Sequence, residues 1–156
     1  MGENEHRVRR ATPADATAVA RLLHDFNTEF GEPTPGAATL AERAERMLAA
    51  GELTVLLGGD GPDGIAQLRF SPSIWSDAPG AYLEELYVAP ARRGRGMGRA
   101  LLEAAMETAR EAGADHIDLN TAETDEAARG LYESAGFTNR EGAPDGPRML
   151  YYERGL

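Results

Sequence analysis

The chain has 156 residues, with 26 acidic side chains against 16 basic ones, a net charge of −10 and no cysteine. This length predicts one domain with a full hydrophobic core, and the lack of cysteine excludes thiolate catalysis, disulfides and cysteine-bound zinc. All 16 basic residues are arginine, which excludes a Schiff-base lysine and a Walker phosphate loop, and the negative charge argues against nucleic acid as a partner.

The first half of the chain predicts a strand, two helices and a hairpin. A short strand at 6–11 precedes a helix that Thr12 caps and that carries apolar residues at three- and four-residue steps. After a loop rich in glycine and proline, residues 39–50 form a second helix. Residues 52–58 and 64–70 are expected to be strands joined by a turn of glycine, aspartate and proline.

The second half continues the alternation of strands and helices. We expect a strand at 81–88, a helix at about 96–112, a strand at 115–120 and a helix at 125–135. Two last strands are expected at about 137–140 and 148–153. This order predicts an α/β (α+β) fold in a single domain spanning residues 1–156.

A glycine-rich loop between the strand at 81–88 and the next helix is the central feature. Its glycines stand at alternate positions, Gly94, Gly96 and Gly98. Small residues let a ligand approach the backbone, and the first N–H groups of the helix attract an anion. Four of the 16 arginines fall within eight residues here, namely Arg92, Arg93, Arg95 and Arg99. The loop therefore predicts a ligand rich in phosphate, although a solvated turn is the simpler alternative.

The segment from Arg93 to Gly98 has the form R-x-x-G-x-G, and the sequence here resembles the GNAT superfamily of acetyl-CoA-dependent N-acetyltransferases. The resemblance extends upstream through Tyr-Leu-Glu-Glu-Leu-Tyr-Val (82–88) and downstream to Gly-Leu-Tyr-Glu-Ser-Ala-Gly-Phe (130–137). With the order of elements it covers roughly residues 6–154. It implies a mixed, mostly antiparallel sheet of six to seven strands with helices on both faces.

The resemblance also implies how acetyl-CoA is bound. The strand before the loop would splay from its neighbour, and its free backbone groups would bind the pantetheine arm and the thioester through Leu86, Tyr87 and Val88. Backbone N–H groups would cradle the pyrophosphate along the loop, at Arg93, Gly94, Arg95, Gly96, Met97, Gly98 and Arg99.

Three residues are candidates for catalysis. By resemblance, Tyr132 would protonate the departing thiolate, and a phenol with a pKa near 10 is a suitable acid for it; the alternative is a packed aromatic residue. Glu84 and Glu85 are candidate bases for the incoming ammonium ion. On a regular strand they face opposite sides, so only one would reach the cleft, and the resemblance favours Glu84. The alternative is two partly solvated carboxylates without a role.

One position departs from the family's pattern. The family often has asparagine where this chain has Asp125, and an ionised aspartate accepts hydrogen bonds but cannot donate them. Asp125 also suits a helix N-cap, so the family's cofactor role for asparagine is not carried over to it.

The acceptor is expected to be a primary amine of a small cationic molecule. The segments 26–36 and 71–80 are expected to flank the cleft, and Glu29, Glu32 and Asp77 add negative charge there. The competing hypothesis is a non-catalytic acyl-CoA-binding sensor or structural protein on the same fold.

The remaining expectations concern metal, membrane and assembly. The three histidines lack metal-ligand spacing, so no metal site is expected. No apolar run approaches the roughly 20 residues of a membrane span, and the first ten residues do not resemble a signal peptide. We therefore expect a cytoplasmic protein with no membrane partner, and the resemblance suggests a homodimer.

Overall fold

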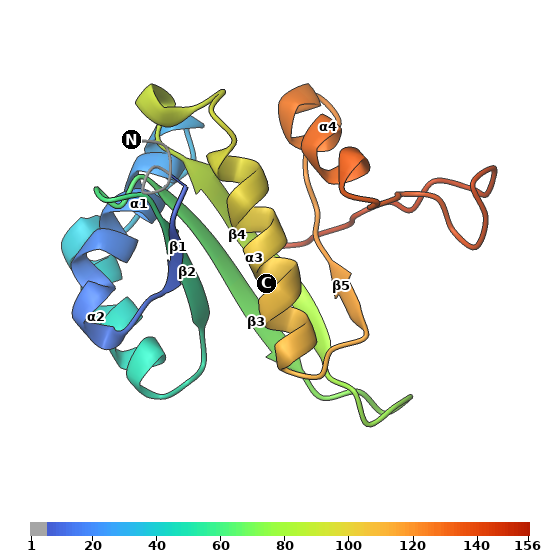
Figure 1. The fold of residues 1–156 in the computed structure, drawn as a ribbon, viewed down its shortest axis with the longest axis horizontal. Coiled ribbons are helices and arrows are strands. Elements are labelled where there is room, and N and C mark those ends of the chain that lie inside the picture. Colours follow the sequence, from blue (N-terminus) through green and yellow to red (C-terminus); the bar gives the residue numbers. More distant parts are fainter. Residues whose placement is uncertain (1–5) are drawn as a thin grey trace. The chain divides into compact units, whose positions relative to one another are not determined.

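The computed structural model describes residues 6–156. Its regular elements are β1 (Val8–Arg10), α1 (Ala16–Glu29), α2 (Ala37–Ala49), β2 (Thr54–Gly58), β3 (Gly64–Ser71), β4 (Gly80–Val88), α3 (Met97–Glu111), β5 (His116–Asp118) and α4 (Glu126–Ser134) (Figure 1). Short 3-10 helices at Pro13–Asp15 and Pro90–Arg92 precede α1 and α3. The chain divides into two compact units, one ending at Leu119 and one comprising Asn120–Leu156.

The first unit is built on a mixed sheet. Within the described residues the sheet has five strands in the order β1-β2-β3-β4-β5. The pairs β1–β2, β2–β3 and β3–β4 are antiparallel, and β4–β5 is parallel. The expected mixed and mostly antiparallel sheet is thus confirmed, whereas the expected number of six to seven strands is wrong.

The chain enters α1 through the 3-10 helix Pro13–Asp15, whose N-cap is Thr12, and Asp15 is the N-cap of α1 itself. The Thr12 backbone N–H donates to the Asp15 carboxylate at 2.8 Å, and Pro13 occupies the first turn, where a missing N–H does no harm. The Arg9 guanidinium also binds Asp15, with an Nη2–Oδ1 distance of 2.8 Å. Hydrogen bonding to Arg9 and to the Thr12 backbone holds the pKa of Asp15 well below its usual range. The sequence signal and the structure agree at this boundary.

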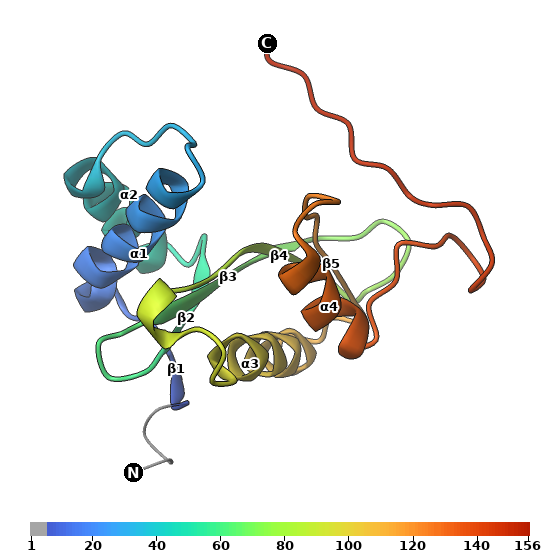
Figure 2. The ribbon, with the colours of Figure 1, turned by 90° about the horizontal axis from the view of Figure 1, so that it is seen from above.

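Helices α1 and α2 cover one face of the sheet (Figure 2). Val19 and Leu22 of α1 are fully buried, and they share a core with Ile65 of β3 and Tyr87 of β4. Successive residues of a strand face opposite sides, so Ile65 and Tyr87 define the α1 side of the sheet.

Helix α3 covers the other face of the sheet. A Cβ atom at Gly64 would lie 2.8 Å from side-chain atoms of both Leu101 and Met97, so this glycine allows α3 to approach β3 closely. Leu101 is fully buried there. The expectation of helices on both faces is confirmed.

Strand β4 has a second neighbour over only part of its length. Its residues 80–82 pair with His116–Asp118 of β5, and the pairing ends there, while β3 follows β4 to Val88. Within the described part of the chain, residues 83–88 therefore have a sheet partner on one side alone. The resulting edge is the splayed strand that the resemblance implies.

The second unit holds α4 and an irregular C-terminal segment. The Asp125 carboxylate accepts a hydrogen bond from the Ala128 N–H at 3.0 Å, so Asp125 is the expected N-cap. The strands expected at 137–140 and 148–153 do not form; within residues 120–156 a single antiparallel bridge joins Arg140 and Arg148. A two-stranded ribbon alone is marginal in water, and residues 120–156 hold no third strand to extend it, which accounts for the difference.

Candidate active site

The strand, loop and helix predicted around the three glycines are present. Gly94 and Gly96 have φ angles of +76° and +92°, a region that glycine adopts without strain. Gly96 is the N-cap of α3, and no side chain of the described residues caps the helix there. The first turn of α3 thus presents backbone N–H groups and the positive end of the helix dipole to an anion.

The surroundings of this loop fit a phosphate group. Among the described residues, no atom lies within 4 Å of a Cβ placed at Gly94, so the backbone is open on that side. The ring of His6 lies beside Gly96, 3.8 Å from a Cβ placed there. The Nδ1 atom of His6 is buried and has no hydrogen-bond partner within residues 6–156. The His6 ring atoms that face Gly96 are Nε2 and Cε1, so this side chain forms part of the wall beside the loop. The sequence pattern gave His6 no role.

The Arg93 side chain is engaged by the protein itself. Its Nη2 atom lies 2.8 and 2.9 Å from the two carboxylate oxygens of Glu29, and its Nε donates to the Val88 carbonyl at 2.9 Å. The guanidinium carbon lies 5.4 Å from the centre of the Tyr87 ring. Glu29 therefore neutralises the charge of Arg93, so this side chain offers a phosphate less positive charge than the sequence pattern predicts.

The other residues predicted to bind the cofactor differ in which of their atoms are exposed. The Tyr87 ring is buried and stacks on Phe26 at 4.8 Å, and its hydroxyl donates to Glu29 at 3.0 Å. The Met97 side chain is 2% exposed and belongs to the core beneath α3. Leu86 and Val88 lie on the edge that β5 leaves without a sheet partner. Backbone groups are thus what this region offers to a ligand.

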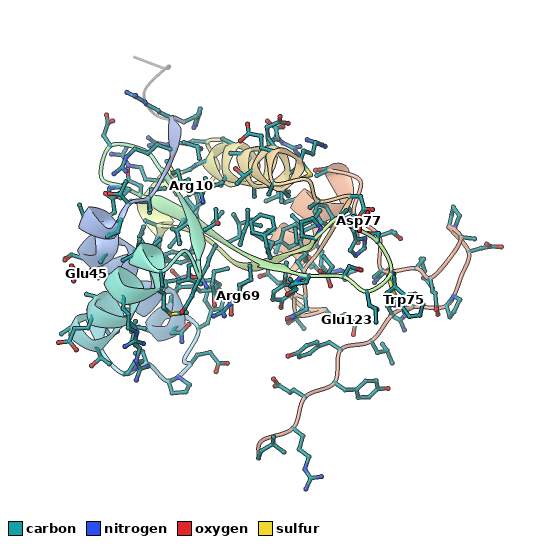
Figure 3. The ribbon with its side chains drawn as sticks, turned by 90° about the horizontal axis from the view of Figure 1, so that it is seen from below. Arg10, Glu45, Arg69, Trp75, Asp77 and Glu123 are labelled. Atoms are coloured by element: carbon teal, nitrogen blue, oxygen red, sulfur yellow. The ribbon has the colours of Figure 1, made fainter. Side chains whose placement is uncertain are left out.

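A β-bulge places Glu84 and Glu85 on one face of the sheet, so the expectation of opposite faces is wrong. The register between β3 and β4 shifts between Gln67 and Leu68, which makes Glu84 an extra residue on β4. Glu85 pairs with Gln67 and shares its face. The Glu84 carboxylate accepts from the Gln67 amide at 2.6 Å and from the Arg69 guanidinium, so it lies on that face as well. Figure 3 labels Arg69 on its strand.

The two carboxylates have different environments. Glu84 forms an ion pair with Arg69. Burial, reinforced by the negative charge of Glu84, raises the pKa of the Glu85 carboxyl to about 7. A group with this pKa exchanges protons readily at neutral pH, which is what a general base requires. Both carboxylates stay candidates for the base: the resemblance favours Glu84, and the raised pKa makes Glu85 suitable.

Tyr132 lies in α4 of the second unit. It is half-buried, and its ring centre lies 5.9 Å from that of Phe137 in the same unit. The turn after α4 brings the two rings together, because the Phe137 N–H donates to the Tyr132 carbonyl at 3.0 Å. The catalytic role of Tyr132 stays a prediction.

A comparison with known protein families shows to which family the chain belongs. The family described as "Acetyltransferase (GNAT) family" matches residues 17–137. The chain belongs to this family. The resemblance seen in the sequence is confirmed, and the chain is a GNAT acetyltransferase by family.

Individual relatives of this GNAT chain agree with the assignment. The chain is 30% identical over 155 residues to the aminoglycoside N(6')-acetyltransferase type 1 of Stenotrophomonas maltophilia, which covers 96% of this chain and 93% of that protein. It is 41% identical over 69 residues to the mycothiol acetyltransferase of Beutenbergia cavernae, or 42% of this chain and only 23% of that protein. A crystal structure of a protein from Arthrobacter sp. FB24, assigned as an acetyltransferase, has a TM-score of 0.88 at 50% identity and 96% coverage of both chains.

The two segments expected to flank the acceptor cleft lie at opposite ends of β4 in this GNAT chain. Ser71 pairs with Gly80 at the start of the strand, whereas Glu29 contacts Tyr87 near its end. Seven residues of strand span about 23 Å, so the two segments meet β4 at points far apart along the strand. Trp75 marks the first end in Figure 3. The C-terminal end of α1 contacts Tyr87, and the roles of both segments in binding an acceptor stay predictions.

The structure also bears on metal binding and on insertion into a membrane. No group of three or more potential metal ligands gathers within residues 6–156. In the same range, every helix is too short or too polar to cross a membrane.

Proposed function

We propose that this GNAT acetyltransferase moves the acetyl group of acetyl-CoA to a primary amine of a small cationic molecule. The observation that carries the proposal is the continuous site along the second half of β4. There Glu85, whose pKa is raised to about 7, lies on the part of β4 that has one sheet partner within the described residues, and the strand runs on into the glycine loop at the N-terminus of α3. The name of the Stenotrophomonas relative and the net charge of −10 support a cationic acceptor.

The cofactor would lie along β4 and end at the glycine loop. The backbone of Leu86, Tyr87 and Val88 would hold the pantetheine arm, except that the Val88 carbonyl is already engaged by Arg93. The backbone N–H groups between Gly94 and Arg99 would bind the pyrophosphate, because the helix N-terminus stabilises negative charge. Bound acetyl-CoA supplies the thioester carbonyl that the amine attacks and the thiolate that leaves.

Proton transfer would use Glu85 and Tyr132. An amine reaches the site as an ammonium ion and must lose one proton before its nitrogen can form the new C–N bond. Glu85 would accept this proton, directly or through water, while Arg69 and Gln67 hold Glu84 as a fixed negative charge beside it. As the C–S bond breaks, the Tyr132 hydroxyl would donate its proton to the sulfur. The segment after α1, including Glu32, would contact the acceptor.

The test is consumption of acetyl-CoA with a panel of amines that includes aminoglycosides, polyamines and amino-acid amides. We expect turnover with at least one cationic small molecule and a dissociation constant for CoA in the micromolar range by calorimetry. A chain that binds CoA but acetylates no amine in the panel would support the acyl-CoA-binding sensor instead.

The Tyr132→Phe variant separates catalysis from binding. We expect its affinity for CoA to equal that of the wild type and its kcat to fall by about 10²-fold or more, because only the acidic proton is removed. An unchanged kcat would return Tyr132 to the role of a packed aromatic residue.

The cytoplasmic location and the homodimer stay predictions from the sequence.

A further inference from the structure

A network of three side chains connects α1 to the glycine loop. The Glu29 carboxylate, at the last residue of α1, accepts from the Tyr87 hydroxyl at 3.0 Å and from Arg93 at 2.8 and 2.9 Å. Arg93 also donates to the Val88 carbonyl and lies over the Tyr87 ring. The network therefore joins the C-terminus of α1, the end of β4 and the first residue of the R-x-x-G-x-G segment.

The network fixes the Arg93 side chain in three directions. Glu29 binds its Nη2 atom, the Val88 carbonyl binds its Nε, and its guanidinium carbon lies over the Tyr87 ring, 5.4 Å from the ring centre. A planar guanidinium used in this way is oriented as well as neutralised. Tyr87 is itself fixed by stacking on Phe26 of the same helix.

Resting on the proposed function, we infer that Glu29 is a positioning residue for the cofactor loop. By holding Arg93 against the end of β4, it fixes where the loop begins, and therefore where Gly94 and Gly96 place their N–H groups for the pyrophosphate. Glu29 itself does not contact the cofactor. The assignment also removes Glu29 from the carboxylates expected to attract a cationic acceptor, because its charge is already used by Arg93.

Glu29 is therefore expected to affect the affinity for CoA, although it lies on α1, the helix before the segment expected to contact the acceptor. Loss of the Glu29 charge leaves Arg93 without its ionic partner, and the loop then has to be ordered when CoA binds. Partly exposed ion pairs are worth little singly, and this pair is supported by two further contacts. We expect a fivefold weaker affinity for CoA, about the effect of a single supported ion pair.

The experiment is calorimetric titration of CoA into the full chain at fixed ionic strength. Glu29→Gln and Arg93→Gln are expected to weaken CoA binding by about fivefold each, and the double variant by no more than either one, because the residues act as a unit. The matched control is Glu45→Gln, which removes one negative charge from an exposed position on α2 (Figure 3) and is expected to leave CoA affinity within twofold.

Kinetics provide a second readout that a general loss of structure would not produce. For Glu29→Gln, the KM for acetyl-CoA is expected to rise by the same factor, with kcat within twofold of the wild type. If Glu29→Gln does not fold, Glu29→Asp keeps the charge but is one methylene shorter, and it is expected to weaken CoA binding in the same direction.

Three results would overturn the inference alone: unchanged CoA affinity in Glu29→Gln, tighter binding because the released Arg93 contacts a phosphate, or additive losses in the double variant. A wild-type chain that does not bind CoA would overturn the proposed function, and this inference with it.

Discussion

The two ends of strand β4 differ sharply. At the Val88 end, Tyr87 is buried and bonded to Glu29, and the following loop is tied to α1 through Arg93. At the Gly80 end, the preceding loop exposes 92% of Ile74 and 93% of Trp75 and lines an open hollow of about 480 Å³. The same strand thus leads from an exposed loop, held by short-range contacts, to an end supported by contacts from distant parts of the chain.

This difference indicates which end of β4 can hold catalytic groups in place. Transition-state stabilisation depends on groups that are already in place before the substrate binds. The Val88 end meets this requirement through contacts from α1, α3 and β3, whereas hydrogen bonds within the 72–79 loop, such as that from the Trp75 N–H to the Ser73 hydroxyl, join near neighbours. A hollow alone is therefore a poor guide to the active site of this chain.

The largest expected effect comes from Glu85, toward the Val88 end. Glu85→Gln keeps the shape of the side chain but removes the proton acceptor, so kcat for an amine substrate is expected to fall by about 10²- to 10⁴-fold. Steady-state kinetics with acetyl-CoA and the best amine measure this. Glu84→Gln is the matched comparison, and an equal or larger loss there would reverse the assignment of the base.

The pH dependence follows from the raised pKa of Glu85. The carboxylate is the active form, so kcat/KM is expected to fall as the pH drops through about 7, and Glu85→Gln is expected to lose this limb of the profile. The folded state holds the proton more tightly than the unfolded state, so this group makes the protein less stable as pH rises from about 4.5 to about 7. Glu85→Gln should therefore raise the Tm at pH 8, which also shows that the variant folds.

The next effect is on cofactor binding at the start of α3. Gly96→Val places a β-branched residue at a φ of +92°, where the strain is on the order of 1–3 kcal/mol, and we expect CoA to bind about tenfold more weakly. Gly113→Val is the control, because Gly113 has a φ of +85° just after the other end of α3. It should lower the Tm comparably and leave CoA affinity unchanged; equal losses of affinity would mean that strain alone is responsible.

The smallest effect is expected at the Gly80 end. Trp75→Ala removes a side chain that is 93% exposed, so the KM for a small amine and the Tm are both expected to change by little, with KM within twofold. Kinetics on the best amine check this. A tenfold rise in KM would show that acceptors reach the hollow beside Trp75 and would weaken the contrast between the two ends.

Local sequence signals predicted the helix caps and the glycine loop correctly. The Thr12 and Asp125 caps and the loop from Gly94 to Gly98 stand where the sequence placed them. It failed at Glu84, because a bulge depends on how two strands pair and leaves no mark in one strand's alternation. It also failed for the strands at 137–140 and 148–153, which have strand-like residues but no third strand to extend them within their own unit.

The sequence by itself determined the family, the anion-binding loop and the candidate groups Tyr132, Glu84 and Glu85, because motifs of residue type and spacing survive without knowledge of contacts. Only the tertiary structure decided which carboxylate is held by an arginine and which is buried with a raised pKa. It also showed that the Arg93 side chain binds Glu29, 64 residues away in the chain. Burial and ion pairing are set by neighbours distant in sequence, so no local pattern could assign them.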